Sequence, residues 1–200
     1  MGAYGAEYPH FQYCIERAGK PSRRIYDVLR HTLPLLGSVK KGDRVLDVGC
    51  GIGEFGHDLN KLGLQTVSFD MSLYAQQKGV LVFGKENSNS RVVGNTLDLP
   101  FPDKSFDMVT SWDLLEHLTP DQIKFALGEF KRVAKGNKIF IKLTPTEDAV
   151  NIDKDITHIT KWNERTWEEW FQRNGLATLG NPTRHIFGKT THGNFLLEKI

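Results

Sequence analysis

The sequence has little cysteine, no long hydrophobic run and no strong excess of charge of either sign. Two cysteines in 200 residues, Cys14 and Cys50, are too few to indicate a disulfide framework or a zinc site built from cysteine. No stretch of about eighteen apolar residues occurs and the N-terminus lacks an apolar signal core, so we expect a cytoplasmic protein without a membrane partner. The net charge of +2, from 26 basic and 24 acidic residues, argues against nucleic acid as a partner.

What the sequence does contain is an alternation of short apolar strands and amphipathic helices, with 39% hydrophobic residues in total. Strands are expected at residues 44–48, 65–69, 91–93, 106–111 and 138–143, and helices at residues 55–62, 72–80, 119–133 and 163–174. Residues 80–83 fit either a helix end or a strand. The alternation predicts an α/β fold with a doubly wound, mostly parallel sheet and helices on both faces.

A turn with three glycines at alternate positions links the first expected strand to its helix: Gly49, Gly51 and Gly53. Such a turn brings bare backbone against a ligand, and Gly51, Gly53 and Gly56 also fit the weak dinucleotide pattern G-x-G-x-x-G. Asp47 precedes the turn, and its carboxylate would repel a pyrophosphate but suits a ligand with a cationic end. Asp70 ends the next expected strand, where it can bind a ribose diol or instead cap the following helix. A ligand with a ribose and a cationic end, but no phosphate, is S-adenosylmethionine.

Four motifs occur along the chain in this order: residues 45–53, Asp70, residues 99–109 and residues 114–118. In order and spacing they resemble a class I S-adenosylmethionine-dependent methyltransferase of the small type-11 methyltransferase-domain family, over residues from about 40 to 145. The resemblance implies a Rossmann-like sheet of seven strands, in which residues 176–179 and 194–197 form an antiparallel C-terminal edge hairpin. It also implies S-adenosyl-L-methionine as cofactor, S-adenosyl-L-homocysteine as product and a transferase activity.

The same resemblance assigns the cofactor site to the glycine turn and to the ends of the strands around it. In this assignment Asp47 faces the methionine amine, Asp70 binds the ribose and Met71 covers the adenine. Asn95 stands where many relatives carry aspartate, and its amide oxygen can still accept a bond from the adenine amino group. The implied contacts are Asp47, Gly49, Cys50, Gly51, Gly53, Asp70, Met71, Asn95, Thr96, Leu97, Ser111 and Trp112. Trp112 can equally be a core anchor.

The acceptor side is expected in the stretch that follows the fifth strand, where Asp155 and His158 stand three positions apart. This run looks like one seen in small methyltransferases of sugar and glycan pathways, which makes His158 the candidate base and Asp155 its orienting group. The alternative is that His158 bonds to a loop and Asp155 is solvated. Asp153, Asp155 and His158 can also gather a divalent cation, but we expect no metal.

Four further residues are predicted to contact the acceptor: Asp113, Trp162, Tyr13 and His117. Each has a plainer alternative, since Asp113 can cap a helix, His117 can be a packed helix residue and the N-terminal aromatics can be a disordered end. Trp167 and Trp170 share a helix face and are expected in the core.

Taken together, these patterns predict one domain over residues 1–200, with an N-terminal helical lid (1–40), a cofactor-binding core (41–145) and an acceptor-side segment (146–200). The predicted function is O-methylation of a small polar acceptor, such as a sugar or glycan hydroxyl, by direct displacement. The alternatives are N-methylation of a small metabolite and a methyltransferase-like binding module without activity. We expect a monomer or homodimer.

Overall fold

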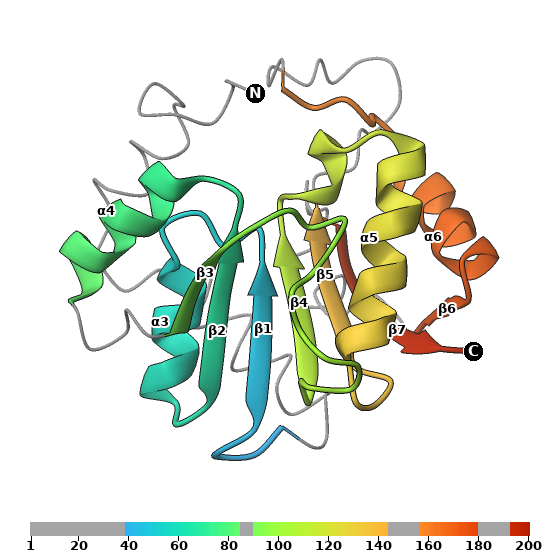
Figure 1. Ribbon diagram of the computed structural model, residues 1–200. Coiled ribbons are helices and arrows are strands. Elements are labelled where there is room, and N and C mark those ends of the chain that lie inside the picture. The colour runs from blue at the N-terminus through green and yellow to red at the C-terminus, as the bar shows by residue number, and fades with distance from the viewer. Residues whose placement is uncertain (1–38, 85–89, 144–156, 180–192) are drawn as a thin grey trace.

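The computed structural model describes residues 39–84, 90–143, 157–179 and 193–200, and Figure 1 shows their arrangement. The expected N-terminal lid helix, Tyr13 and Asp155 lie outside these described residues.

The sheet confirms the predicted fold class, including its antiparallel C-terminal strands. Its strands are β1 (Arg44–Val48), β2 (Gln65–Asp70), β3 (Arg91–Val93), β4 (Met108–Trp112), β5 (Ile139–Leu143), β6 (Leu176–Thr178) and β7 (Gly193–Lys199). They lie in the order β3-β2-β1-β4-β5-β7-β6, as one seven-stranded sheet. The first five strands in this order, β3, β2, β1, β4 and β5, are parallel to their neighbours. Strand β7 is antiparallel to both β5 and β6.

The helices are α3 (Glu54–Lys61), α4 (Leu73–Phe83), α5 (Pro120–Val133) and α6 (Glu164–Arg173), with a short 3-10 turn, η2 (Leu115–His117). Side chains cap the starts of α4, α5 and α6, whereas α3 begins after Gly53 without a side-chain cap. The Ser72 side chain caps α4, and residues 80–83 continue that helix rather than forming a strand. Thr119 and Gln122 form a capping box at the start of α5, whose first residue is a proline.

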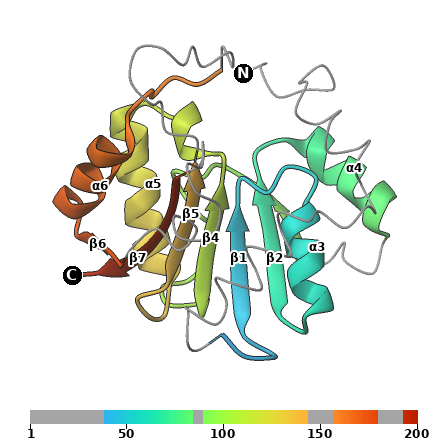
Figure 2. The ribbon, with the colours of Figure 1, turned by 180° about the vertical axis from the view of Figure 1, so that it is seen from behind.

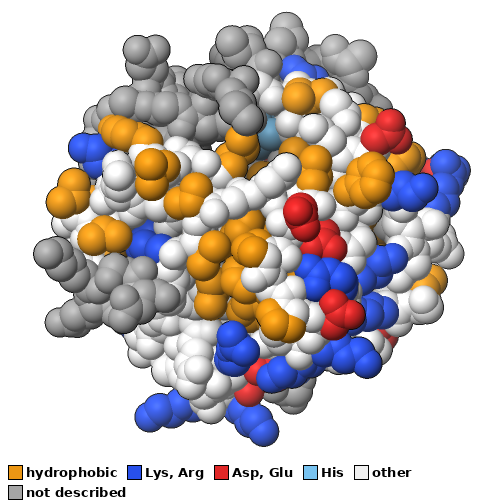
Figure 3. All heavy atoms as spheres, viewed as in Figure 1, with side chains coloured by type: hydrophobic (Ala, Val, Ile, Leu, Met, Phe, Trp, Pro, Cys, Tyr) orange, Lys and Arg blue, Asp and Glu red, His pale blue; other side chains and the backbone are white. Residues whose placement is uncertain are grey.

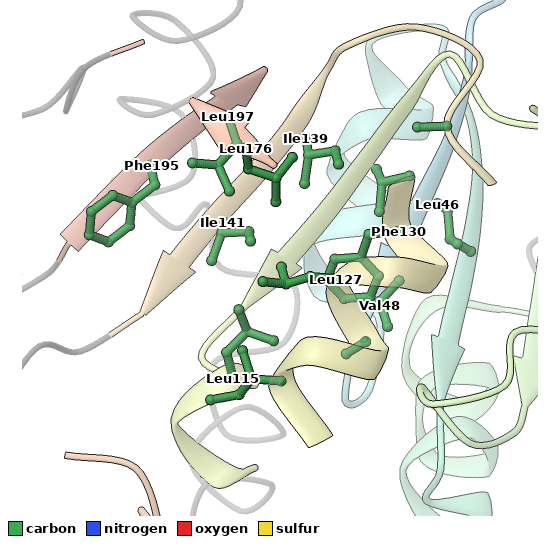
Figure 4. Close-up of a cluster of buried hydrophobic side chains, with 14 of the residues drawn as sticks. Leu46, Val48, Leu115, Leu127, Phe130, Ile139, Ile141, Leu176, Phe195 and Leu197 are labelled. Atoms are coloured by element: carbon green, nitrogen blue, oxygen red, sulfur yellow. The ribbon is translucent and has the colours of Figure 1, made fainter. Parts of the chain in front are cut away.

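Two apolar clusters hold these elements to the two faces of the sheet (Figures 1 and 2). The larger one packs α5 and α6 against β1, β4, β5 and β7, and Figure 4 shows Leu127 and Phe130 of α5 against Val48 and Ile141. On the other face, Phe55 and Leu59 of α3 pack against Val45 and Met108. Burial of these side chains is the main force that fixes the strand ends on which a site can be built.

The described surface mixes charges of both signs. On the face in Figure 3, acidic and basic side chains lie side by side, and Arg132 of α5 pairs with Glu129 and Asp103 at 2.7 and 2.9 Å. The same guanidinium donates to the carbonyls of Leu99 and Phe101, so it fastens the loop before β4 to α5. No helix among the described residues is both long and apolar enough to cross a membrane.

Candidate active site

The strand order places a ligand crevice beside β1. From β1 the chain winds outward to β2 and β3 on one side and to β4 and β5 on the other. In an open α/β sheet, ligands bind beyond the carboxyl ends of the strands at such a switch point. Figure 1 shows the carboxyl ends of β1, β2, β4 and β5 meeting at one edge of the sheet.

The glycine turn after β1 has the backbone that only glycine adopts easily. Gly49, Gly51 and Gly53 have φ values of 76°, 54° and 78°, all in the left-handed region. The amides of Gly49 and Cys50 both donate to the Phe69 carbonyl, at 2.8 and 3.2 Å, which ties the turn to β2. A Cβ built on Gly49 would lie 3.0 Å from atoms of Leu114. The turn is therefore held in one shape by its neighbours on both sides.

Asp70 holds the turn and remains able to bind a ligand. One oxygen accepts from the Gly51 amide and the other from the Ser72 amide, each at 2.8 Å. Because Ser72 caps α4, the alternative in which Asp70 caps that helix is not what the structure shows. A carboxylate oxygen can accept two bonds, so each still has capacity for one hydroxyl of a ribose diol. Burial raises the pKa of Asp70, against the lowering effect of these backbone bonds.

Asp47 is fully buried at the end of β1, with 1% of its surface exposed. The Thr110 hydroxyl donates to one of its oxygens at 3.1 Å, whereas its second oxygen has no hydrogen-bond partner among the described residues. Burial raises the pKa of Asp47 to about 7, and the Thr110 bond opposes this rise. A buried carboxylate oxygen without a donor is a place for a cationic group, and the methionine amine of S-adenosylmethionine fits that requirement.

The predicted adenine contacts lie at the ends of β2 and β3. Met71 follows Asp70 and is 61% exposed, so its side chain is free to cover a ring. The Asn95 amide oxygen accepts from the Leu97 amide at 3.0 Å, which leaves it one further bond for an adenine amino group. The buried Thr96 hydroxyl has no partner among the described residues, and Leu97 packs against the larger apolar cluster.

The end of β4 carries both a predicted cofactor contact and a core anchor. Ser111 is buried, and its hydroxyl finds no partner in the described part of the chain. The Trp112 ring packs between Phe55 and Phe140, with ring centroids 4.4 and 5.5 Å away, so the core-anchor alternative holds for its side chain. Its predicted backbone contact with the cofactor stays a prediction.

An ion pair that the sequence analysis did not anticipate lies beside this strand end. The Lys142 ammonium contacts both oxygens of Asp113, at 2.6 and 2.5 Å, and lies 5.6 Å from the Trp112 ring centroid. Asp113 has a φ of 47°, which is rare for a residue with a side chain and marks local strain. The available signal was a lysine inside the otherwise apolar run of residues 139–143.

The two candidate histidines meet on the acceptor side. The rings of His117 and His158 are in an edge-to-face contact with centroids 4.7 Å apart. His117 Nδ1 is bonded to both the carbonyl and the hydroxyl of Thr157, at 3.2 and 3.1 Å. The amides of Ile159 and Thr160 donate to the Glu116 carbonyl, so the segment that carries His158 is fastened to η2.

The tryptophans of the acceptor-side segment form one cluster. Trp162 lies just before α6 and contacts Trp167 and Trp170, each at 4.9 Å between ring centroids. Trp167 is fully buried, as expected, and Trp162 and Trp170 pack against the same apolar cluster. Part of the Trp162 ring is thus used in packing, and its predicted acceptor contact stays a prediction.

Sequence reasoning also missed the groups beneath the glycine turn, chiefly Arg91 and Gln76. The Arg91 guanidinium donates to Gln76, whose amide donates in turn to the Cys50 sulfur at 3.1 Å. Polar residues at the start of a short strand and inside a helix carry no signal of such a contact. No group of three or more potential metal ligands occurs among the residues that the structure describes.

Comparison with known proteins agrees with this geometry. A family model described as a methyltransferase domain matches residues 22–180. A probable tocopherol O-methyltransferase of Oryza sativa subsp. japonica is 36% identical over 126 residues, covering 58% of this chain and 34% of that protein. Ajmaline N-methyltransferase of Rauvolfia serpentina is 35% identical over 121 residues, covering 56% and 41%. This chain therefore spans well under half the length of these two curated relatives.

Solved structures share the fold over almost the whole chain. Magnesium protoporphyrin IX methyltransferase of Synechocystis PCC 6803, solved with bound S-adenosylhomocysteine, superposes with a TM-score of 0.71 at 16% identity, covering 98% of this chain and 96% of that one. A protein of Pyrococcus horikoshii OT3 gives 0.70 at 20% identity, covering 96% and 98%. The matched family model spans most of the sequence, and the turn, Asp47 and Asp70 fit the cofactor of that family. The chain belongs to the methyltransferase-domain family, whose methyl donor is S-adenosylmethionine.

Proposed function

We propose that the chain is an S-adenosylmethionine-dependent O-methyltransferase that acts on a hydroxyl of a small polar acceptor, such as a sugar or glycan. The observation that carries the acceptor chemistry is the contact between the imidazoles of His117 and His158 beside the turn that follows β4. Bound S-adenosylmethionine supplies a methyl group already activated by its sulfonium charge, so positioning of the acceptor does most of the work. An oxygen acceptor also needs a base for its proton, and imidazole suits that task near neutral pH.

In this proposal His158 takes the proton of the acceptor hydroxyl at an imidazole nitrogen as that oxygen becomes methylated. The fastening of its segment to η2 through the Glu116 carbonyl supports a fixed position for the ring. The bonds of His117 Nδ1 to Thr157 fix the neighbouring imidazole, whose ring contacts that of His158. The predicted orienting role of Asp155 falls on a residue outside the described ranges and stays part of the proposal.

The acceptor class rests on the polar character of the groups around the same strand ends. Asp113 lies directly after β4, and its carboxylate is a hydrogen-bond acceptor that favours a partner rich in hydroxyl or amine donors. The relatives include both an O- and an N-methyltransferase by name, so an amine acceptor is the competing possibility. A base of the His158 kind is required for a hydroxyl and dispensable for a neutral amine.

A screen and one pair of variants test the proposal. The protein is incubated with S-adenosylmethionine and panels of sugars, nucleotide sugars, phenols and amines, and products one methylene heavier are sought by mass spectrometry. We expect a hydroxyl product whose formation falls at least about a hundredfold in His158→Ala, the usual scale for loss of a general base. Calorimetric binding of S-adenosylhomocysteine is expected to survive in that variant.

Three outcomes contradict the proposal in different ways. A product only from amines would favour the N-methylation alternative, and full activity of His158→Ala would remove His158 from its role as base. Failure of the wild-type protein to bind S-adenosylhomocysteine would favour a module without activity. Lys161→Ala, an exposed change in the same segment, is the matched control and is expected to leave both activity and binding unchanged.

A further inference from the structure

The guanidinium of the half-buried Arg91, at the start of β3, lies against the cofactor turn. A Cβ atom added to Gly53 would lie 2.8 Å from both terminal nitrogens of Arg91. A Cβ on Gly79, in the middle of α4, would overlap the same guanidinium and the Ile52 carbonyl oxygen. Two glycines from different elements thus leave the space that the arginine head occupies, one of them the last glycine of the turn.

The polar contacts of this guanidinium lead into the turn. Arg91 Nη1 donates to the Gln76 side-chain oxygen at 3.2 Å, and the Gln76 amide nitrogen donates to the Cys50 sulfur at 3.1 Å. Gln76 is itself buried, with 4% of its surface exposed. Arg91 Nε is buried and has no hydrogen-bond partner among the described residues. The Arg91 guanidinium therefore lacks one of its possible hydrogen bonds, which is unfavourable for a partly buried cationic group unless an anionic group nearby compensates its charge.

No carboxylate of the described residues forms a direct ion pair with Arg91, yet Asp47 lies close enough for the two charges to interact. Burial is the main cause that raises the pKa of Asp47, and the charge of Asp70 raises it further, whereas the Thr110 hydrogen bond and, to a smaller extent, the charge of Arg91 lower it. Thr110 of β4 bonds to the Asp47 carboxylate, and the charged groups that act on it are Asp70 from β2 and Arg91 from β3. Arg91 is the one cation among them.

We propose that Arg91 is a positioning residue for the cofactor: a fixed cation, seated between Gly53 and Gly79, that supports the turn and favours the form of Asp47 that receives the cationic amine. The proposal rests on the cofactor role assigned to the turn. Arg91 does not touch the ligand in this account, because it lies below the turn and acts through Asp47 and through the Gln76–Cys50 contacts. A lysine in its place would supply the charge without the planar fork.

The test measures the affinity of S-adenosylhomocysteine by calorimetry between about pH 6 and pH 9 for wild type, Arg91→Met, Arg91→Gln and Arg91→Lys. Wild-type affinity is expected to rise with pH through about 7, as Asp47 ionises. In Arg91→Met and Arg91→Gln the rise is expected at higher pH, with affinity about two- to fivefold weaker at pH 7 and a smaller difference from wild type at pH 9. Arg91→Lys is expected to keep the wild-type pH profile.

Several results would overturn this role. An equal loss of affinity at every pH in the neutral variants would mean that Arg91 only fills space, and no loss would mean that it contributes nothing to binding. If the neutral variants do not fold, a displaced profile in Arg91→Lys would still contradict the proposal, since that variant keeps the charge. Arg165→Met, a change at an exposed arginine of α6, is the matched control. Absence of binding by the wild type would refute the proposed function itself, which separates the two failures.

Discussion

Substituting Asp47 by asparagine is expected to change how the free energy of unfolding depends on pH. Burial raises the pKa of Asp47 from 3.8 to about 7, so the folded protein holds this proton more tightly than the unfolded chain. By linkage, the stability contributed by the protonated carboxyl is lost as pH rises from about 4 to about 7. Ionisation of this carboxyl therefore lowers the free energy of unfolding of the wild type by about 4 kcal/mol at pH 8, and by somewhat under about 2 kcal/mol at pH 5.

The asparagine side chain cannot ionise, so the stability of Asp47→Asn should lack this part of the pH dependence. The amide oxygen still accepts from the Thr110 hydroxyl, but the amide nitrogen replaces an oxygen that has no partner among the described residues. That unsatisfied donor costs about 1 to 3 kcal/mol at any pH. The free energy of unfolding of the variant, relative to that of wild type, should therefore rise by about 2 to 3 kcal/mol from pH 5 to pH 8. The cost of the unsatisfied amide nitrogen is the same at both pH values and does not affect this difference.

Thermal or urea denaturation of the cofactor-free protein at these two pH values measures the effect. For a domain of this size, the gain corresponds to a relative rise of roughly 5 to 10 °C in Tm. Binding of S-adenosylhomocysteine should fall in the same variant, since the carboxylate that is proposed to receive the amine is gone. Asp121→Asn, at an exposed aspartate of α5, is the control and should show neither effect. If wild type and Asp47→Asn lose stability in parallel from pH 5 to pH 8, then Asp47 is ionised at both values and the reasoning fails.

Three other substitutions have consequences that follow from single contacts. Gly79→Ala should cost about 2 to 3 kcal/mol in urea denaturation, since its Cβ would overlap the Ile52 carbonyl oxygen and neither backbone can retreat cheaply. Trp167→Phe should cost only about 1 to 2 kcal/mol, against 3 to 5 for Trp167→Ala, since the buried indole N–H has no partner to lose among the described residues. Lys142→Met should lower the unfolding free energy by about 1 to 2 kcal/mol, a discounted value for losing a charged bond to a partly exposed Asp113. Equal costs for both Trp167 variants, or none for the others, would contradict these contacts.

The strands and the turn could be predicted because their signals are local. Apolar runs bounded by Gly, Asn and Ser located β1, β2 and β3, and the alternate glycines required a left-handed backbone whatever surrounds them. Asp47 and Asp70 could be named because each stands at the carboxyl end of a strand. What could not be foreseen is that both oxygens of Asp70 would already bind backbone amides.

The missed residues depend on contacts across the fold. Arg91 reaches α4 and the turn only because β3 pairs with β2 in a register that sets Ser68 beside Arg91. Lys142 meets Asp113 because β5 lies in parallel beside β4. Periodicity alone fixes neither register, because β3 is only three residues long and β5 is buried on both faces and so shows no alternation of apolar and polar residues.

The two edges of the sheet differ in how they treat charge, and the difference points to function. At the amino edge, Asp107 accepts from the Arg44 amide and pairs with Lys135 at 3.0 Å, an arrangement that stabilises the fold. At the carboxyl edge, a buried carboxylate lacks a second donor among the described residues and an aspartate is held in a strained backbone conformation. An arginine beneath them is left partly unsatisfied. Folding alone would favour removing each of these features, so their concentration around one turn is best explained by a ligand whose charge completes them.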